Sequence, residues 1–120
     1  MIGGGGENVT LRITAQHADI WNGAGWDVEE YRHKNQVLTD WCEKVGRDPR
    51  DIERSAILSS ALDGSGPLTG PQRVEEVSRL LAVGAMHPIF PAAGPDYDLA
   101  PLRHLLEWRD SQNSRVETAR

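Results

Sequence analysis

The chain has 120 residues, 38% of them hydrophobic, which is enough for one ordinary domain to build a core without disulfides or metals. Its formal net charge of -5 is spread along the sequence, with acidic and basic residues interleaved over 27–54 and 72–79. No basic face is therefore available for a nucleic acid. The single cysteine, Cys42, excludes an internal disulfide.

The sequence also predicts a cytoplasmic protein without a membrane anchor. One cysteine is typical of a reducing compartment. The first residues run directly into Gly3 and Gly4, without the basic and apolar regions of a secretory signal. No segment approaches the ~20 consecutive apolar residues of a membrane helix.

The first predicted elements are a helix over about 7–17 and a strand over 18–22. The alternation of apolar residues over 9–14 taken alone favours a strand, while Leu11 and Ala15 also fit one face of a helix. The helix is favoured because a glycine-rich turn precedes the segment and an apolar strand follows it a few residues later.

The clearest helix covers about 28–45. Asp27 and Glu30 make an acidic variant of the capping box at its start, and Gly46 followed by Pro49 ends it. Its apolar stripe repeats at spacings of three, four or seven residues and consists of Val28, Tyr31, Leu38, Trp41, Cys42 and Val45. A cysteine on such a stripe is expected to be a buried, inert thiol.

A strand is predicted over 52–58 and a second amphipathic helix over about 72–83, ended by Gly84. The segment 63–71 between them is rich in glycine and proline and is expected to be a loop. Loops of this kind after a strand commonly carry functional groups in α/β folds.

The last strand is predicted over 86–90, although Pro88 removes a donor from its hydrogen-bond ladder and puts its pairing in doubt. Residues 111–120 are polar, lack periodicity and are expected to fray, so the predicted domain covers 1–110. Between them, a third helix follows Asp98 and carries Leu102, Leu105, Leu106 and Trp108.

Strands and helices thus alternate along the chain, at roughly 30 residues per unit. This order predicts an α/β fold in which helices cover a parallel sheet of short, buried strands.

The most informative segment runs from Ile2 to Glu7, between an apolar strand remnant and a predicted helix start. Glycine permits positive φ and a close approach of the backbone, so successive N–H groups and the helix N-terminus can converge on an anion. The segment therefore predicts a phosphate cradle; a flexible leader is the alternative, because the Walker lysine and the Gly-x-Gly-x-x-Gly pattern are absent. The four residues concerned are Gly3, Gly4, Gly5 and Gly6.

Two further motifs follow the glycines. A Leu-Arg-x-x-Ala-x-x-Ala-Asp pattern and an Ala-Asp-x-Trp-Asn strand are formed by Leu11, Arg12, Ala15, Ala18, Asp19, Trp21 and Asn22. With the Gly-Arg-Asp-Pro turn at 46–49, in this order and spacing, they resemble the luciferase-like monooxygenases, above all the branch that depends on the deazaflavin coenzyme F420. The likeness continues through 28–34 and 52–55 and returns at 74–77 and 96–99.

The resemblance implies an oxidoreductase built as the C-terminal half of a (β/α)8 TIM barrel, with about three complete βα units after a strand remnant. The active site of such barrels lies at the C-terminal ends of the strands. In this family it binds coenzyme F420 or, in sister branches, FMN, which exchanges a hydride with a small organic substrate. Carried over to this chain, Gly3 to Gly6 would hold the cofactor phosphate through backbone N–H groups, and Trp21 and Asn22 would lie near the cofactor. No catalytic residue is assigned.

A complete barrel needs ~250 residues, so half of it is missing from these 120. An isolated half exposes two sheet edges and an open interior, which something must cover. A truncated chain that needs its missing half is the favoured explanation; a homodimer or a complementary half-barrel chain is the other. Two further functions stay open: a non-catalytic phosphate or nucleotide binder, and an interaction fragment.

The remaining candidates have simpler structural explanations. No metal site is expected, because the histidines show no ligand spacing such as His-x-x-x-His. Trp21 is left open between the barrel core and a wall of the cofactor site. His87 is the histidine of most interest, because its strand could point toward the barrel mouth. The four histidines are His17, His33, His87 and His104.

Overall fold

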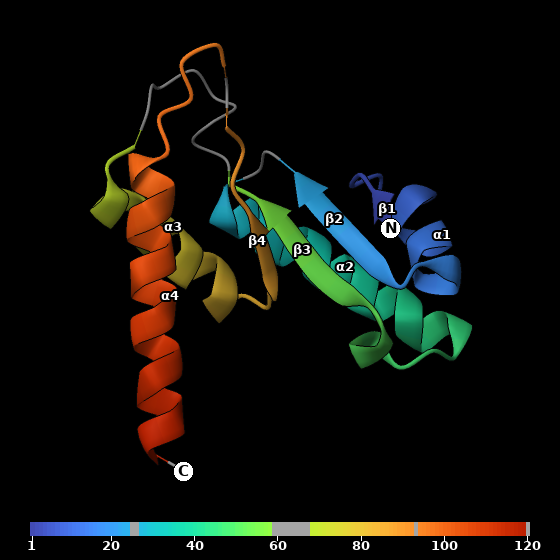
Figure 1. Cartoon of the computed structure of the whole chain (residues 1–120). Coiled ribbons are helices and arrows are strands. Elements are labelled where there is room, and N and C mark those ends of the chain that lie inside the picture. The colour runs from blue at the N-terminus through green and yellow to red at the C-terminus, as the bar shows by residue number, and fades with distance from the viewer. Residues whose placement is uncertain (25–26, 59–67, 93, 120) are drawn as a thin grey trace.

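The computed structural model describes residues 1–24, 27–58, 68–92 and 94–119 (Figure 1). Most of the predicted loop 63–71 lies outside these ranges. Strands and helices alternate along the chain, so the predicted α/β class is confirmed. The elements are β1 (Ile2–Gly3), α1 (Thr10–His17), β2 (Ile20–Ala24), α2 (Val28–Val45), the short 3-10 helix η1 (Pro49–Asp51), β3 (Glu53–Ile57), α3 (Gly70–Ala82), β4 (His87–Ile89) and α4 (Ala100–Ala119).

The strands form one sheet in the sequential order β1-β2-β3-β4, and each neighbouring pair is parallel. Trp21 of β2 lies between Ile2 of β1 and Arg54 of β3. Directly opposed residues of parallel strands point to the same face of a sheet, and successive residues point to opposite faces. This register therefore decides which side chains face the helices.

Pro88 stands in the middle of β4, and the strand forms in spite of it. It lies opposite Ala56 of β3. Just before the strand, the Met86 N–H donates to the Arg54 carbonyl oxygen at 2.7 Å. Since β4 is at one end of the strand order, it is an edge strand, where proline is tolerated.

Helix α2 has the predicted limits. Asp27 caps its start, where Oδ1 accepts the Glu30 N–H at 2.8 Å. Gly46 ends it in the left-handed conformation, with φ of 74°. The prediction is confirmed here because both ends are coded by residues next to the helix.

Helix α1 starts at Thr10, three residues later than predicted. Val9 precedes it and supplies no side-chain cap, so residues 7–9 form a turn instead. Helix α3 starts earlier than predicted, at Gly70, because Thr69 and Gln72 form a capping box that the sequence analysis overlooked.

Helix α4 extends through Ala119, whereas residues 111–120 were expected to fray. The difference has a local cause. The hydroxyls of Ser114 and Thr118 donate to backbone carbonyls four residues earlier, at 2.9 and 2.8 Å. These hydroxyls thus find acceptors within the helix itself. The last turns of α4 therefore form without an apolar stripe.

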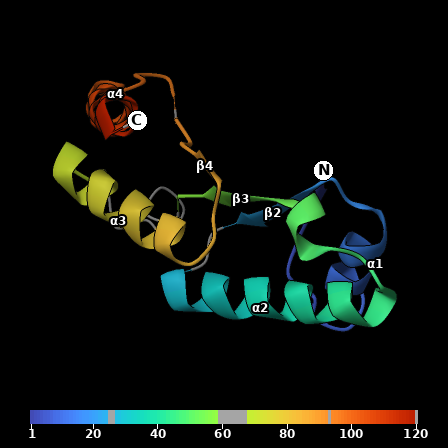
Figure 2. The ribbon, with the colours of Figure 1, turned by 90° about the horizontal axis from the view of Figure 1, so that it is seen from below.

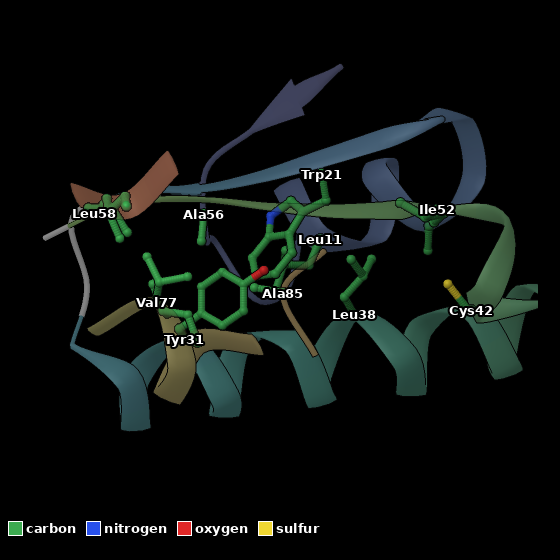
Figure 3. Packing of buried hydrophobic residues seen from close by; sticks show 13 residues of the cluster. Leu11, Trp21, Tyr31, Leu38, Cys42, Ile52, Ala56, Leu58, Val77 and Ala85 are labelled. Atoms are coloured by element: carbon green, nitrogen blue, oxygen red, sulfur yellow. The ribbon is translucent and has the colours of Figure 1, made fainter. Parts of the chain in front are cut away.

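The core lies between the sheet and the helix layer. In Figure 2, α1, α2 and α3 lie on the same side of the sheet, and α4 follows next to α3. Figure 3 shows Trp21, Ala56 and Leu58 pointing from the strands toward this layer, where Tyr31 and Leu38 meet them from α2. All five side chains are at most 2% exposed.

The opposite face of the sheet has no helix across it among the described residues (Figure 2). The strand alternation places on this face the side chains of Ile20, Asn22, Glu53, Ser55, Ile57, His87 and Ile89. Parallel sheets are normally covered on both faces. We refer to these seven residues as the open face.

Candidate functional site

The carboxyl ends of the four strands meet at one edge of the sheet, because all of them run in the same direction (Figure 1). Ligands of parallel α/β folds bind at this edge. The glycine segment Gly3–Gly6 leaves β1 here and leads into α1. The structure therefore places the sequence-predicted loop where a ligand site is expected.

The start of the glycine loop is fastened to β2. Gly3 pairs with Asn22, and the Gly4 N–H donates to the Asn22 carbonyl oxygen at 3.3 Å. Gly4 has φ of 112°, which an L side chain rarely adopts. In return, the Gly4 carbonyl accepts a 2.9 Å hydrogen bond from Trp21 Nε1. The chain can turn away from the strand at Gly4 because this residue is glycine.

The end of the loop lies against the first turn of α1. The Gly6 carbonyl accepts the Leu11 N–H at 2.9 Å. A Cβ atom at Gly6 would lie 2.9 Å from Thr10 Oγ1, so a side chain there would force Thr10 to move. The absence of a side chain is what allows the loop to approach the helix N-terminus this closely.

Two N–H groups of the loop have no internal acceptor. Among the described residues, the amides of Gly5 and Gly6 make no hydrogen bond, and neither residue is buried. A turn over residues 7–9 separates them from α1, and the Gly6 carbonyl contacts the first turn of that helix, whose N-terminal end carries a partial positive charge. Unpaired N–H groups at a helix N-terminus are the donor set that binds phosphate oxygens.

Glu7 holds the loop on α2. Its Oε1 lies 3.0 Å from Lys34 Nζ and 2.8 Å from His33 Nε2, and its carbonyl accepts the Trp41 indole N–H at 2.7 Å. The hydrogen bonds from Lys34 and then His33 lower the pKa of the Glu7 carboxyl. The carboxylate is therefore paired with the Lys34 ammonium, which reduces its repulsion toward an anion at the neighbouring glycines.

Trp21 is fully buried in the core, with its ring centroid 5.2 Å from that of Tyr31. Trp21 therefore packs as part of the core, and its indole N–H adds a contact to the glycine loop. This hydrogen bond fixes the position of the Gly4 carbonyl relative to β2.

Asn22 is half-buried on the open face, next to the glycine loop. Its Oδ1 lies 2.9 Å from the Ser55 hydroxyl, which also lies 3.1 Å from the Trp21 carbonyl. The structure therefore brings Gly3–Gly6 and Asn22 together, and the fully buried Ser55, which the sequence analysis did not select, positions the Asn22 side chain through its hydroxyl. The equal spacing of Asn22 and Ser55 within their strands was the available sign, but it needed the register to be useful.

His87 faces the same side of the sheet as Ser55, and its Nδ1 lies 2.7 Å from Glu53 Oε1. Both residues stand at the first positions of their strands. In the strand register His87 lies opposite Ser55, Ser55 lies opposite Asn22, and Asn22 pairs with Gly3, so His87 shares one row of the sheet with the start of the glycine loop.

Other reactive groups are enclosed. Cys42 is fully buried, and burial raises the pKa of its thiol, which keeps it protonated. Within the described ranges, no group of three or more histidine, cysteine or carboxylate side chains gathers where it could hold a metal ion.

The fold and the site thus define a parallel α/β protein with a candidate anion-binding loop at the carboxyl edge of its sheet. No protein-family model matches the chain, and no curated protein matches it. None of the helices in the described residues has the length and hydropathy needed to cross a membrane.

Proposed function

We propose that the chain is the cofactor-phosphate half of a luciferase-like oxidoreductase and that Gly3–Gly6 bind the phosphate of coenzyme F420 or, alternatively, FMN. One observation carries the proposal: the unpaired N–H groups of Gly5 and Gly6 stand before α1 at the carboxyl edge of a parallel sheet. The motifs around Leu11 and Asn22 resemble this family, and this resemblance is the reason for proposing coenzyme F420 or FMN as the cofactor.

The half-barrel architecture belongs to the same proposal, and the strand order supports it. A TIM barrel is a parallel sheet of sequential order with its helices outside. The order β1-β2-β3-β4 agrees with a segment of such a barrel. The position of α2, α3 and α4, which follow one another around the outside of the sheet in Figure 2, also agrees with it.

The residues of this chain would contribute binding and orientation. The amides of Gly5 and Gly6 donate to phosphate oxygens, Trp21 holds Gly4 in place through its indole N–H, and Asn22 presents a side-chain amide on the open face. A bound deazaflavin or flavin supplies the hydride chemistry itself. The substrate would be a small organic molecule.

A non-catalytic phosphate or nucleotide binder is the second candidate. On the open face the side chains of Asn22, Ser55, Ile57 and Ile89 are not ionisable. His87, which lies opposite Ser55, is already engaged by the Glu53 carboxylate at 2.7 Å. Binding without hydride exchange would favour this candidate.

The experiment is a fluorescence titration of the purified chain with coenzyme F420 and with FMN. The key variants are Gly5→Glu and Gly5→Gln, which have the same shape but differ in charge. Gly5 is not among the glycines with positive φ, so both substitutions are compatible with its backbone. We expect the glutamate variant to bind at least about 10-fold more weakly than the glutamine variant, because a carboxylate repels phosphate at the cradle.

Equal affinities for the two Gly5 variants would overturn the phosphate assignment. Absence of binding to both cofactors by the unmodified chain would overturn the cofactor class. Hydride exchange between the bound, reduced cofactor and an organic acceptor then separates the oxidoreductase from the non-catalytic binder.

A further inference from the structure

Both ends of the sheet have an unpaired edge. Within the described residues, the outer edge of β1 and the outer edge of β4 have no partner strand. Exposed edges are templates for pairing with another chain. Pro88 offers no N–H at the outer edge of β4, so pairing there uses its carbonyl oxygen and donors of the added strand. Because β1 and β4 run in the same direction, β4 of one copy can lie parallel to β1 of another and continue the same strand direction.

The open face needs a cover of its own. Ile57 and Ile89 lie side by side on it, and neither is buried. Glu53 Oε1 lies 2.7 Å from His87 Nδ1, so the carboxylate on this face has a hydrogen-bond partner. A second sheet of the same kind can therefore face it without burying an unpaired ion.

A cavity of about 320 Å³ lies beside β4, on the side of the helix layer. Its lining is almost wholly apolar and comes from α3, β4, α4 and residues next to β3 and β4, with Leu58, Val77, Pro88, Phe90, Leu105 and Trp108 among them. A strand added to β4 would direct its helix-facing side chain into this space. In β1 that side chain is Ile2, which lies opposite the helix-facing Trp21.

We propose that two copies of this chain associate so that β4 of each pairs with β1 of the other, which closes an eight-stranded parallel barrel. Two sheets of four strands supply the eight strands of a (β/α)8 barrel. A two-fold axis along the barrel keeps all strands parallel and makes the two junctions identical. Ile2 of each copy fills the cavity beside β4 of the other.

This closure deepens the proposed function, since it rests on the half-barrel architecture. It places the two glycine loops at the same mouth of one barrel, and each open face becomes part of the barrel interior. The candidate site at the carboxyl edge is then completed by the second copy. Failure to bind a cofactor leaves the association intact, so the two proposals are tested separately.

The first test is the molecular mass in solution, measured by light scattering on a size-exclusion column. One chain has a mass of 13.3 kDa, and we expect a single species of about twice that mass. A monomer at micromolar concentration would overturn the closure. So would an open series of larger species, because it would show β4–β1 pairing that does not close.

The matched variants are Met86→Asp and Val116→Asp. Met86 lines the cavity and is 61% exposed in the single chain, while Val116 is 55% exposed near the end of α4 and does not line it. We expect the Met86 variant to run as a folded monomer, with helical circular dichroism retained. The Val116 variant should stay dimeric. Equal behaviour of the two variants would contradict the proposed junction.

A disulfide test identifies the paired edges. Cysteine is placed at Ile2 in one preparation and, in separate preparations, at His87, Pro88 or Ile89. Three strand spacings of ~4.8 Å separate β1 from β4 within one sheet, which is beyond the reach of a disulfide. We expect a covalent dimer when the two kinds of preparation are mixed and oxidised, and none from either kind alone. No cross-link at any of the three positions would overturn the pairing of β1 with β4.

Discussion

The support of the glycine loop by Trp21 gives a quantitative prediction for Trp21→Phe. The indole ring is fully buried, and its N–H donates to the Gly4 carbonyl at 2.9 Å. Phenylalanine keeps an aromatic ring against Tyr31 but removes the N–H and part of the ring volume. The variant therefore tests the hydrogen bond and the packing together.

The expected cost is the sum of two contributions. Loss of the hydrogen bond costs about 0.5–1.5 kcal/mol, toward the lower end because Gly4 is exposed and water can replace the donor. Removal of about 40 Å³ of buried side chain, at ~24 cal/mol per Å³ of cavity, costs about 1 kcal/mol. The free energy of unfolding should thus fall by about 1.5 kcal/mol.

The assay is urea unfolding followed by circular dichroism. One protein concentration is used throughout, so that any self-association contributes equally to every measurement. With an m-value of about 2 kcal/mol/M, the midpoint should fall by about 0.7 M urea. Trp41→Phe is the comparison, because Trp41 donates a similar bond to the Glu7 carbonyl from a half-buried position. A Trp21 variant that loses no more stability than the Trp41 variant would refute the packing argument.

Three further predictions concern the elements around the site. Burial raises the pKa of Tyr31 to about 12, above its ordinary value of 10.0. The stability that its neutral hydroxyl contributes is therefore complete below pH 10 and is lost as the pH rises toward 12. Tyr31→Phe should flatten this fall of stability in unfolding experiments between about pH 9 and 11.5, and an unchanged slope would argue against it. Gly46→Val should lower the free energy of unfolding by about 1–2 kcal/mol, because φ of 74° is unfavourable for a β-branched residue. Gly46→Asn should lower it less, and equal losses for the two variants would contradict the role of the left-handed cap. Thr69→Ala removes the capping box of α3 and should cost about 1 kcal/mol by urea unfolding, whereas no change in the midpoint would show that the cap is dispensable.

The sequence predicted those elements whose ends are coded locally. Asp27 and Gly46 lie next to α2 and set its limits, so the predicted helix over 28–45 agrees with the structure. The start of α1 was harder to predict, because no capping side chain marks it. The end of α4 was missed because polar side chains continue that helix, and an apolar period is the main sign of a helix in a sequence.

The candidate site was predictable only in part, for a physical reason. Glycines of a loop are visible in the sequence, and their position at the carboxyl edge follows from the order of the elements. The direction of Trp21 and the meeting of Asn22 with Ser55 depend on strand register, since a shift of one residue exchanges the faces of a strand. Register is set by long-range pairing, which a local pattern does not contain.

The sequential strand order has a consequence for how the chain folds. Every strand of the sheet pairs with the strand that precedes or follows it in the sequence. Each new strand therefore finds its partner already synthesised, one helix earlier, and no loop has to close over a longer distance. Short sequence separation lowers the entropy lost on pairing and speeds folding. The sheet can thus grow from β1 to β4 in the direction in which the ribosome delivers the chain.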